Sequence, residues 1–332
     1  MRKLCLILIA LNVSLSASAA SPSFKEIDKI RIGGVGRWDY ITLDSVQHRL
    51  YVSHSTATEV LDTGANALLG TIQETPGVHG IAIAPSLGVG FISDGGIDAV
   101  TVFDLASLKT VAKIKVGQNP DAILFDPASR RVMTFNGKSH DVTIIDAEAR
   151  KVVATVPVGG KPEFAQLDAA GHAWFNVDET NELAVLDPRA GKLIRRTALT
   201  SCEGPSGLTI DDKQRLYAVC DNKQMVVVSP DGKVLGHTRI GAGADGVAWL
   251  DGAAYSANGD DGTISVVRET APNRFEVVET FATAVGARTI AADPATRRLY
   301  LPASSQLQPV GAAKRRIGFD GSFYVLVLEK QR

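Results

Sequence analysis

The stretch LFDPASRRVMTFNGKSHDVTIIDAEARKVVATVPV, residues 124–158, decides the fold because its pattern of strands and turns recurs along the chain. A short apolar strand ends on Asp126, and a polar turn and a second strand follow it. The third strand, Val142 to Asp146, alternates apolar and polar residues and again ends on Asp. Lys151 to Val158 is longer and more charged, which suits the outer edge of a sheet. The stretch therefore predicts a four-stranded unit of about 40 residues.

The same pattern occurs seven times. The first strand of each unit ends at an anchor position, and successive anchors lie 39 to 43 residues apart: Asp44, Pro85, Asp126, Asp168, Asp211, Leu250 and Asp293. Pro85 and Leu250 mark degenerate copies, and residues 302–320 interrupt the last unit. A period of this length made of short strands is typical of propeller blades. The sequence therefore predicts an all-β, seven-bladed β-propeller with four-stranded blades.

The two ends of the chain predict how the ring closes. The last unit contains strands near Thr289 to Ala292, near Leu299 and at Phe323 to Leu328, but it lacks a fourth strand. Phe24 to Ile32 resembles a fourth strand with no unit before it. Pairing the two ends would complete the seventh blade and remove two exposed sheet edges. The alternative is an N-terminal arm that is free to bind a partner.

Composition and charge exclude several classes of protein. The 332 residues are 45% hydrophobic and 21% charged, which is a globular composition, and the formal net charge is -1. This balance lacks the basic excess of a duplex nucleic-acid binder. Amphipathic helical periodicity is absent, so no glycine-rich phosphate loop opens a helix. No stretch is long and apolar enough to predict a membrane-spanning helix.

The first 19 residues have the order of a secretory signal peptide. Arg2 and Lys3 precede an apolar run from Leu4 to Leu15, and Ala17-Ser18-Ala19 offers small residues for cleavage. We therefore expect residues 1–19 to be a signal peptide and residues 20–332 to be a single propeller domain. The location predicted for the mature chain is periplasmic or secreted.

Cys202 and Cys220 are predicted to form a disulfide. Cys202 lies nine residues before Asp211 and Cys220 nine residues after it, so the intervening hairpin brings them to the same end of neighbouring strands. An oxidising compartment lets such a pair persist. The predicted separation is the ~4.4–6.8 Å between Cα atoms that a disulfide needs.

Strand parity predicts which residues share a face of the ring. The linker before each first strand and the loop between the second and third strands lie on one face, which we call the linker face. The anchor turns lie on the opposite, anchor face, where their Asp residues are expected to form turns. The linkers are predicted to place the following residues around the mouth of the central channel: Trp38, Asp39, His79, Gly80, Asp121, Glu163, Ser206, Asp245 and Arg288. The second-to-third loops bring to the same face His54, Asp94, Asn136, His140, Asn176 and Asn258.

This mouth is the predicted ligand-binding site. Its predicted binding residues are Trp38, Asp39, His54, His79, Asp121, Asn136, His140, Glu163, Asp245, Asn258 and Arg288. Like charges held together there should perturb one another's pKa. A purely structural alternative is that each acid caps its own linker or pairs with the neighbouring blade. The insertion 302–320 belongs to a second-to-third loop and is expected over the same face, in the position of a lid.

The repeats resemble the YVTN-repeat, YncE-like family of seven-bladed β-propellers over the whole mature chain. The clearest matches are the Arg-Leu-Tyr strands, as at Arg215-Leu216-Tyr217, and the Val-x-Val-hydrophobic-Asp strands, as at Val100 to Asp104. The linkers Gly117 to Asp121 and Gly159 to Glu163 also match. The resemblance implies an extracytoplasmic propeller, but it does not fix an activity.

Three functions stay open. The favoured one is a non-catalytic, monomeric propeller that binds a small ligand or a protein partner at the mouth. The second is a metal-dependent hydrolase or lyase resembling lactonase-type propellers, with Asp121, Glu163 and Asp245 holding a divalent cation and a histidine as base. The third, nucleic-acid binding, is disfavoured because the mouth is acidic, so a stacking groove would need another surface, such as one near Lys314-Arg315-Arg316. The sequence assigns no catalytic residue. The identity of any cofactor stays open, with a divalent cation as the candidate.

Overall fold

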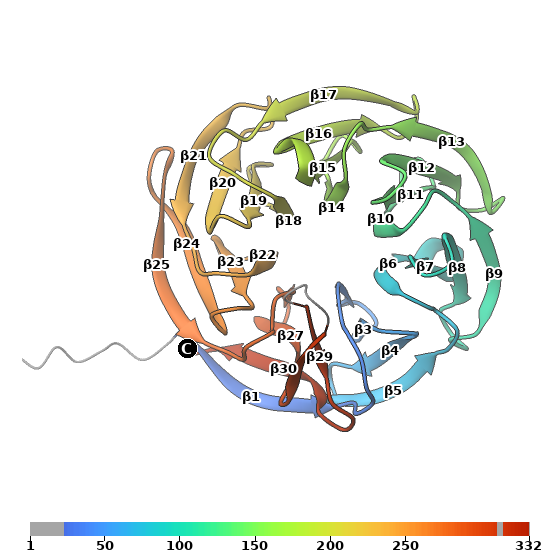
Figure 1. Cartoon of the computed structure of the whole chain (residues 1–332), viewed down its shortest axis with the longest axis horizontal. Helices are drawn as coiled ribbons and strands as arrows, with labels where there is room; N and C mark the ends of the chain where they lie inside the picture. Colours follow the sequence, from blue (N-terminus) through green and yellow to red (C-terminus); the bar gives the residue numbers. More distant parts are fainter. Residues whose placement is uncertain (1–22, 311–314, 332) are drawn as a thin grey trace, which may run out of the picture.

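The computed structural model describes residues 23–310 and 315–331, and for 308–310 and 315–317 it describes the backbone alone. The predicted signal peptide and the side chains of Lys314-Arg315-Arg316 therefore lie outside the described residues. Seven four-stranded antiparallel sheets surround a central channel (Figure 1). The predicted all-β, seven-bladed propeller is confirmed.

Each of the first six blades is built from four consecutive strands, ordered from the channel outward. Blade 1 contains β2 (Ile41–Asp44), β3 (Arg49–His54), β4 (Ala57–Asp62) and β5 (Ala67–Ile72). Blade 2 contains β6 (Val78–Ala84), β7 (Val89–Asp94), β8 (Ala99–Asp104) and β9 (Thr110–Lys115). Blade 3 contains β10 (Pro120–Asp126), β11 (Arg131–Asn136), β12 (Asp141–Asp146) and β13 (Lys151–Pro157). Blade 4 contains β14 (Pro162–Leu167), β15 (Ala173–Val177), β16 (Glu182–Asp187) and β17 (Lys192–Ala198).

The remaining blades complete the ring. Blade 5 contains β18 (Pro205–Ile210), β19 (Leu216–Cys220), β20 (Gln224–Val228) and β21 (Val234–Arg239). Blade 6 contains β22 (Ala244–Leu250), β23 (Ala253–Asn258), β24 (Thr263–Ala271) and β25 (Arg274–Ala282). Blade 7 contains β26 (Ala291–Asp293), β27 (Arg298–Ser304), β30 (Phe323–Lys330) and β1 (Phe24–Arg31). Two short 3-10 turns, η1 (Pro85–Leu87) and η2 (Asp178–Thr180), lie between strands.

The ring closes by pairing of the two ends of the chain, as predicted. β1 lies antiparallel to β30 from the Phe24–Lys330 pair to the Arg31–Tyr324 pair. Phe24 is buried, and its ring lies 5.3 Å from that of Tyr255 in blade 6. The closing strand therefore contributes both backbone hydrogen bonds and apolar contacts, because it completes one blade and covers the next.

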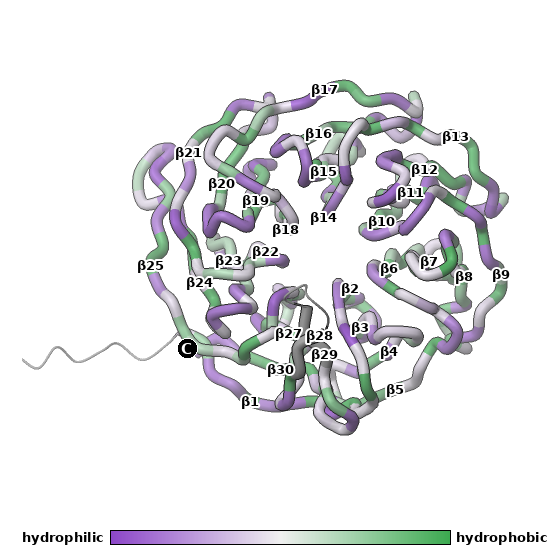
Figure 2. Tube along the Cα trace, viewed as in Figure 1, coloured by the Kyte–Doolittle hydropathy of each residue, from purple (hydrophilic) through white to green (hydrophobic). Residues whose placement is uncertain are grey.

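The hydrophobic core lies between blades. Seven clusters of buried side chains each join two neighbouring blades. Middle strands such as β7 are buried along their full length, whereas outer strands such as β13 are mostly exposed. Figure 2 shows polar residues near the channel at β6, β10, β14 and β22. The polar residues at the channel are therefore carried by a rigid apolar ring.

The anchor turns are held by their own aspartates. Asp44 accepts hydrogen bonds from the backbone N–H groups of Val46 and Gln47. Asp126, Asp168, Asp211 and Asp293 accept equivalent bonds from residues two positions ahead. Their predicted role as turn formers is confirmed.

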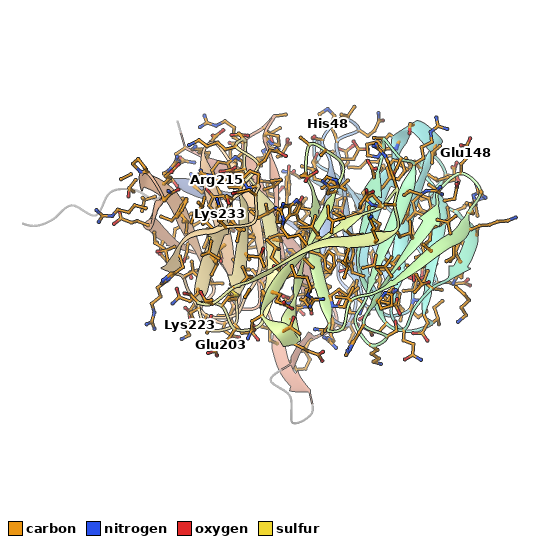
Figure 3. All side chains as sticks on the ribbon, turned by 90° about the horizontal axis from the view of Figure 1, so that it is seen from above. His48, Glu148, Glu203, Arg215, Lys223 and Lys233 are labelled. Carbon is orange, nitrogen blue, oxygen red and sulfur yellow. A yellow bond between two sulfur atoms is a disulfide. The ribbon has the colours of Figure 1, made fainter. Side chains whose placement is uncertain are left out.

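The insertion in blade 7 forms a hairpin of β28 (Leu307–Val310) and β29 (Arg315–Gly318). Gly318 pairs with Gly36 in the linker before β2, and Leu307 packs beside Trp38. Figure 3 shows the hairpin projecting from the face that carries Glu203 and Lys223, opposite His48 and Glu148. The hairpin thus stands on the linker face, where the sequence places it. Its action as a lid stays a prediction.

Candidate functional site

Irregular strand pairing explains how the linker residues reach the mouth of the channel. The register of β10 with β11 skips between Pro120 and Ile123, so Asp121 has no partner in the ladder. Similar skips occur at His79 in β6, at Glu163 in β14 and at Asp245 in β22. An irregularity of this kind turns a side chain away from the sheet. In these four blades the repeat therefore places a charged or titratable side chain at the equivalent irregular position of the inner strand.

His79 lies between two carboxylates. Its Nδ1 donates a hydrogen bond of 2.5 Å to Asp39 Oδ2 and lies 3.5 Å from Asp121 Oδ1. Burial alone would lower the pKa of His79, but the charge of Asp121 and the bond to Asp39 raise this pKa to about 9. The imidazole is therefore protonated at neutral pH, because its surroundings favour the cation.

Asp121 is the least satisfied member of this group. The residue is 7% exposed, and its Oδ1 has no hydrogen-bond partner among the described residues. Burial raises the pKa of Asp121 above its usual range although His79 opposes the shift. Among residues 23–310 and 315–331, a single group of His, Cys, Asp or Glu ligand atoms lies within 4.8 Å of one another: Asp39, His79 and Asp121.

Arg288 binds the opposite side of Asp39. Its guanidinium lies 3.3 Å from Asp39 Oδ1 and 3.1 Å from Asp245 Oδ2, and it donates to the Trp38 carbonyl at 2.7 Å. Burial raises the pKa of Asp245, with Arg288 opposing it. For Asp39 the balance is reversed, since Arg288 and His79 outweigh burial and hold its pKa below the ordinary value.

Tyr40 and Lys161 complete the cluster, and the sequence analysis named neither. The Tyr40 ring packs edge-on against Phe164 at 4.9 Å, and its hydroxyl donates to Glu163 Oε2 at 3.2 Å. Lys161 forms ion pairs with Glu163 and, at 3.5 Å, with Asp178. Burial raises the pKa of Glu163 well above its usual range. Since Tyr40 precedes blade 1 and Glu163 belongs to blade 4, the tyrosine spans the channel.

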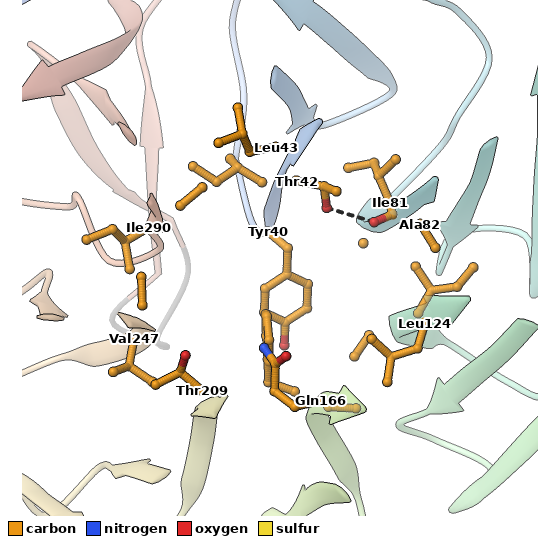
Figure 4. A pocket seen from close by; sticks show the side chains of 18 of the residues that line it. Tyr40, Thr42, Leu43, Ile81, Ala82, Leu124, Gln166, Thr209, Val247 and Ile290 are labelled. Carbon is orange, nitrogen blue, oxygen red and sulfur yellow. Dashed lines mark hydrogen bonds between the residues drawn. The ribbon is translucent and has the colours of Figure 1, made fainter. Parts of the chain in front are cut away.

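Tyr40 separates the charged mouth from the rest of the channel. On its anchor side lies a cavity of about 550 Å³ lined by the inner strands. Figure 4 shows Tyr40 within this space, with Leu124, Val247 and Ile290 along the walls. Among the described residues no charged side chain lines this cavity, and Thr42 and Gln166 already donate to the carbonyls of Ile81 and Leu208. The charged groups therefore lie on the linker side of Tyr40.

Two smaller cavities open beside the cluster. One of about 260 Å³ is lined by Arg288, Asp245, Asp221 and Asp260, with Trp38 and three glycines. The other, of about 280 Å³, is bordered by Asp39 and His79 together with Ser55 and Thr56. Both have Arg37 and Trp38 in their walls. A small molecule in either cavity would touch the charged cluster directly.

The structure places the other predicted binding residues outside this cluster. His54 is buried, stacks on Phe323 at 4.3 Å between ring centres, and bonds Glu59 through Nδ1. Asn136 and Asn258 bond hydroxyl groups of the neighbouring strand within their own blades. His140 lies 3.5 Å from Glu179 in a more exposed ion pair. Trp38 stacks on Phe323 and lines both cavities with its edge.

Asp94, at the end of β7, is fully buried near the cluster. One of its oxygens accepts a hydrogen bond of 2.5 Å from Thr101, and the other has no partner among the described residues. Burial raises the pKa of Asp94 to about 7. The next residue, Gly95, lies so close to His79 that an added Cβ would be 2.9 Å from the imidazole. Gly95 therefore leaves the space that the His79 ring occupies.

Cys202 and Cys220 form the predicted disulfide. Their Cα atoms are 5.4 Å apart. Cys220 pairs with Pro205 at the linker-face end of β18 and β19. The bond thus ties the linker that enters blade 5 to the second strand of that blade. The predicted pairing and its place at this end of the blade are confirmed.

Comparison with known proteins identifies the fold but does not assign the chain to a family. No protein-family model matches the chain, and no curated protein matches it. Among solved structures, hydrazine synthase of Kuenenia stuttgartiensis is similar, with a TM-score of 0.68 and 14% sequence identity over 79% of this chain and 91% of that chain. At this identity the similarity shows the propeller fold alone.

Proposed function

We propose that this chain is an extracytoplasmic propeller of the YVTN-repeat, YncE-like type that binds a small polar ligand at the linker-face mouth of its channel. The observation that carries the proposal is the convergence of charged side chains from six blades at one recessed place: Asp39, His79, Asp121, Lys161, Glu163, Asp245 and Arg288. Burying these groups costs free energy, which packing of the ring does not require. Ligand sites favour concave places where a few polar groups converge.

The charges around the 260 Å³ cavity favour a ligand that carries both signs. Arg288 supplies a cation for a carboxylate-like group, and Asp221, Asp245 and Asp260 line the same cavity. Burial and the charge of Asp178 raise the pKa of Asp221, so a cationic ligand group would relieve this repulsion. Gly243 and Gly259 in the same wall let Asp260 and Arg288 pack close to the backbone, because an added Cβ would lie 2.7 Å from Asp260 and 2.6 Å from Arg288. A recessed cavity of this size favours a small molecule over a protein surface.

Two features support the proposed extracytoplasmic compartment. Residues 1–19 have the order of a signal peptide, and the Cys202–Cys220 disulfide suits an oxidising environment. Among the described residues, no helix is long and apolar enough to cross a bilayer. The intact mass of protein from the cell envelope tests the cleavage, because a mature chain that retains Met1 would contradict it.

Ligand-induced thermal stabilisation tests the binding site. A panel of amino acids, small carboxylates and sugar acids should contain a compound that raises the melting temperature of the purified chain, because a ligand that binds only the folded state stabilises it. The variant Asp121→Ala/Glu163→Ala/Arg288→Ala should lose this shift while keeping the all-β circular dichroism spectrum.

The matched control is Arg130→Ala/Arg131→Ala, which removes two charges from the anchor face. This variant should respond to the ligand as the unmodified chain does. Binding that survives the triple substitution, or that disappears in the anchor-face control, would overturn the assignment of the site.

A further inference from the structure

We propose that Asp39, His79 and Asp121 form a binding site for one divalent transition-metal cation at the linker-face mouth. This inference rests on the proposed function only in that it adds a cation to the same mouth. One ligand atom from each of the three residues lies within 4.8 Å of the other two, and His79 Nδ1 faces Asp39 Oδ2 on one side and Asp121 Oδ1 on the other. Asp39 lies in the linker before β2, and His79 and Asp121 lie near the start of β6 and β10, so three consecutive blades hold the residues together.

The geometry is close to that of a bound metal. Nitrogen and carboxylate ligands lie about 2.0–2.2 Å from a zinc ion, which places neighbouring ligand atoms about 3–3.5 Å apart. His79 Nδ1 is 3.5 Å from Asp121 Oδ1 and 2.5 Å from Asp39 Oδ2. A cation would replace the proton that His79 now shares with Asp39, and these two atoms would separate by about 0.5–1 Å to reach the spacing of neighbouring ligands. Metal ligands must give up their protons in this way.

Asp121 supplies the independent evidence that something else binds here. Its Oδ1 is buried, points to His79, and has no hydrogen-bond partner among the described residues. Buried polar atoms in folded proteins are nearly always paired, so this oxygen indicates a partner that the protein does not provide. A cation between Asp121 and Asp39 would satisfy it and would also relieve the repulsion between the two carboxylates.

A comparison within the molecule shows that a His–Asp pair alone does not make such a site. On the anchor face, His172 Nδ1 lies 3.3 Å from Asp168 Oδ2. Asp168 also accepts hydrogen bonds from the backbone of Ala170 and from the Trp174 indole, so both of its oxygens have partners. It needs no cation. Asp121 differs because its linker offers it no comparable donor.

The ligand set selects the class of metal. One imidazole nitrogen with two carboxylate oxygens suits first-row transition ions such as Zn²⁺ and Mn²⁺, whereas Ca²⁺ prefers oxygen ligands throughout. Two carboxylates balance the charge of a divalent ion. Arg288 contacts the other oxygen of Asp39 at 3.3 Å and so orients this carboxylate. The 280 Å³ cavity bordered by Asp39 and His79 leaves room for water or a ligand to complete the coordination.

The three acids that the sequence offers as metal ligands are only partly brought together. Asp121 belongs to the group, but Glu163 is bound by Lys161 and Tyr40, and Asp245 is bound by Arg288. Each of these two carboxylates is held by groups other than His79, whereas Oδ2 of Asp39 faces His79. The structure therefore favours Asp39 and His79 in their place.

Isothermal titration of the chelator-treated mature chain with ZnCl₂, MnCl₂ and CaCl₂ tests the site. We expect one Zn²⁺ per chain, weaker Mn²⁺ binding and no saturable Ca²⁺ binding. Asp121→Asn and His79→Gln should each weaken Zn²⁺ binding by at least about 100-fold, and the control His172→Gln should leave it unchanged. Asp121→Asn is nearly isosteric, so it still tests the site if His79→Gln does not fold.

Two results would overturn the proposal. One is the absence of saturable Zn²⁺ binding to the unmodified chain, and the other is an equal loss of affinity in His172→Gln. The organic-ligand panel is run both in chelator and with Zn²⁺ added. Ligand stabilisation without Zn²⁺ binding rejects the metal site alone, and Zn²⁺ binding without ligand stabilisation rejects the proposed ligand function alone.

Discussion

On the anchor face, each aspartate at the end of an inner strand accepts hydrogen bonds from the backbone of its own turn, as Asp44 and Asp126 do. On the linker face, Asp94 and Asp121 each keep a buried oxygen without a partner among the described residues. Aspartate thus stabilises the turns of the anchor face, whereas on the linker face two aspartates each carry a buried oxygen without a hydrogen-bond partner among the described residues. A local backbone donor makes an acid structural, and its absence leaves a group that a ligand can satisfy.

The largest effect is expected from Asp211→Ala on the anchor face. Asp211 bonds the backbone of Lys213 and Arg215 and forms a 2.6 Å ion pair with the buried Arg215 guanidinium. Without Asp211 the turn loses its acceptor and the buried Arg215 guanidinium is left with Glu269, at 2.8 Å, as its carboxylate partner, so the free energy of unfolding should fall by about 3 kcal/mol. Urea denaturation followed by circular dichroism measures the change.

The control for this prediction is Arg130→Ala, which breaks an exposed ion pair with Glu148 on the same face. The unfolding free energy should change by less than about 0.5 kcal/mol. If both variants lose the same stability, the anchor aspartates are not the structural residues that their hydrogen bonds indicate.

In contrast to Asp211→Ala, the substitution Asp94→Asn on the linker face is expected to raise the free energy of unfolding at high pH. The pKa of Asp94 is raised from 3.8 to about 7, so the folded chain binds a proton that the unfolded chain has already released between these values. Stability conferred by the protonated form is therefore lost as pH rises from about 4 to 7 and stays lost above it. Asparagine does not ionise and so avoids this loss. The gain in the free energy of unfolding of Asp94→Asn over the unmodified chain should therefore be roughly 2–3 kcal/mol larger at pH 8.5 than at pH 5. Paired denaturation curves at the two pH values measure it, and a gain independent of pH would contradict the burial of an ionisable oxygen.

The smallest effect concerns the charge of His79. In chelator, the unmodified chain should show a His79 pKa near 9, because Asp121 and Asp39 favour the imidazolium. Asp121→Asn should lower this pKa by roughly one unit, since one of the two charges is removed. An NMR titration of the histidine side chains reads the shift. The backbone amide signals of anchor-face residues should be unchanged by the substitution, and a general change in them would point to a change in the fold.

The fold could be predicted from the sequence because propeller blades repeat. Asp126 and its counterparts recur at a nearly constant interval, and the unpaired strands at the two ends fit each other. The disulfide could be predicted as well, since Cys202 and Cys220 are placed symmetrically about Asp211. These inferences use only position along the chain, which a repeat converts directly into position in space.

Side-chain partners could not be predicted in the same way. Asn136 and Asn258 lie at the predicted end of their blades, but their amides bond the next strand rather than the mouth. Conversely, Lys161 stands two positions before Glu163, and Tyr40 directly follows Asp39. Both residues therefore adjoin positions that the repeat assigns to the mouth. A positive charge in the linker before Glu163 could have indicated that Lys161 pairs with that acid. The contact of Tyr40 with Glu163 could not be predicted, because it depends on the diameter of the channel.

The pairing of β1 with β30 also sets the order in which the molecule can fold. Blades 1 to 6 consist of consecutive strands, so each can form from local hairpins as soon as its own segment is free. Blade 7 must wait until both ends of the chain are present, and its assembly carries the entropy of closing a loop that contains nearly every other residue. Contacts of such long range slow folding and leave sheet edges exposed in the meantime. Once formed, the same pairing makes opening of the ring a concerted event, because β1 also covers the core beside blade 6.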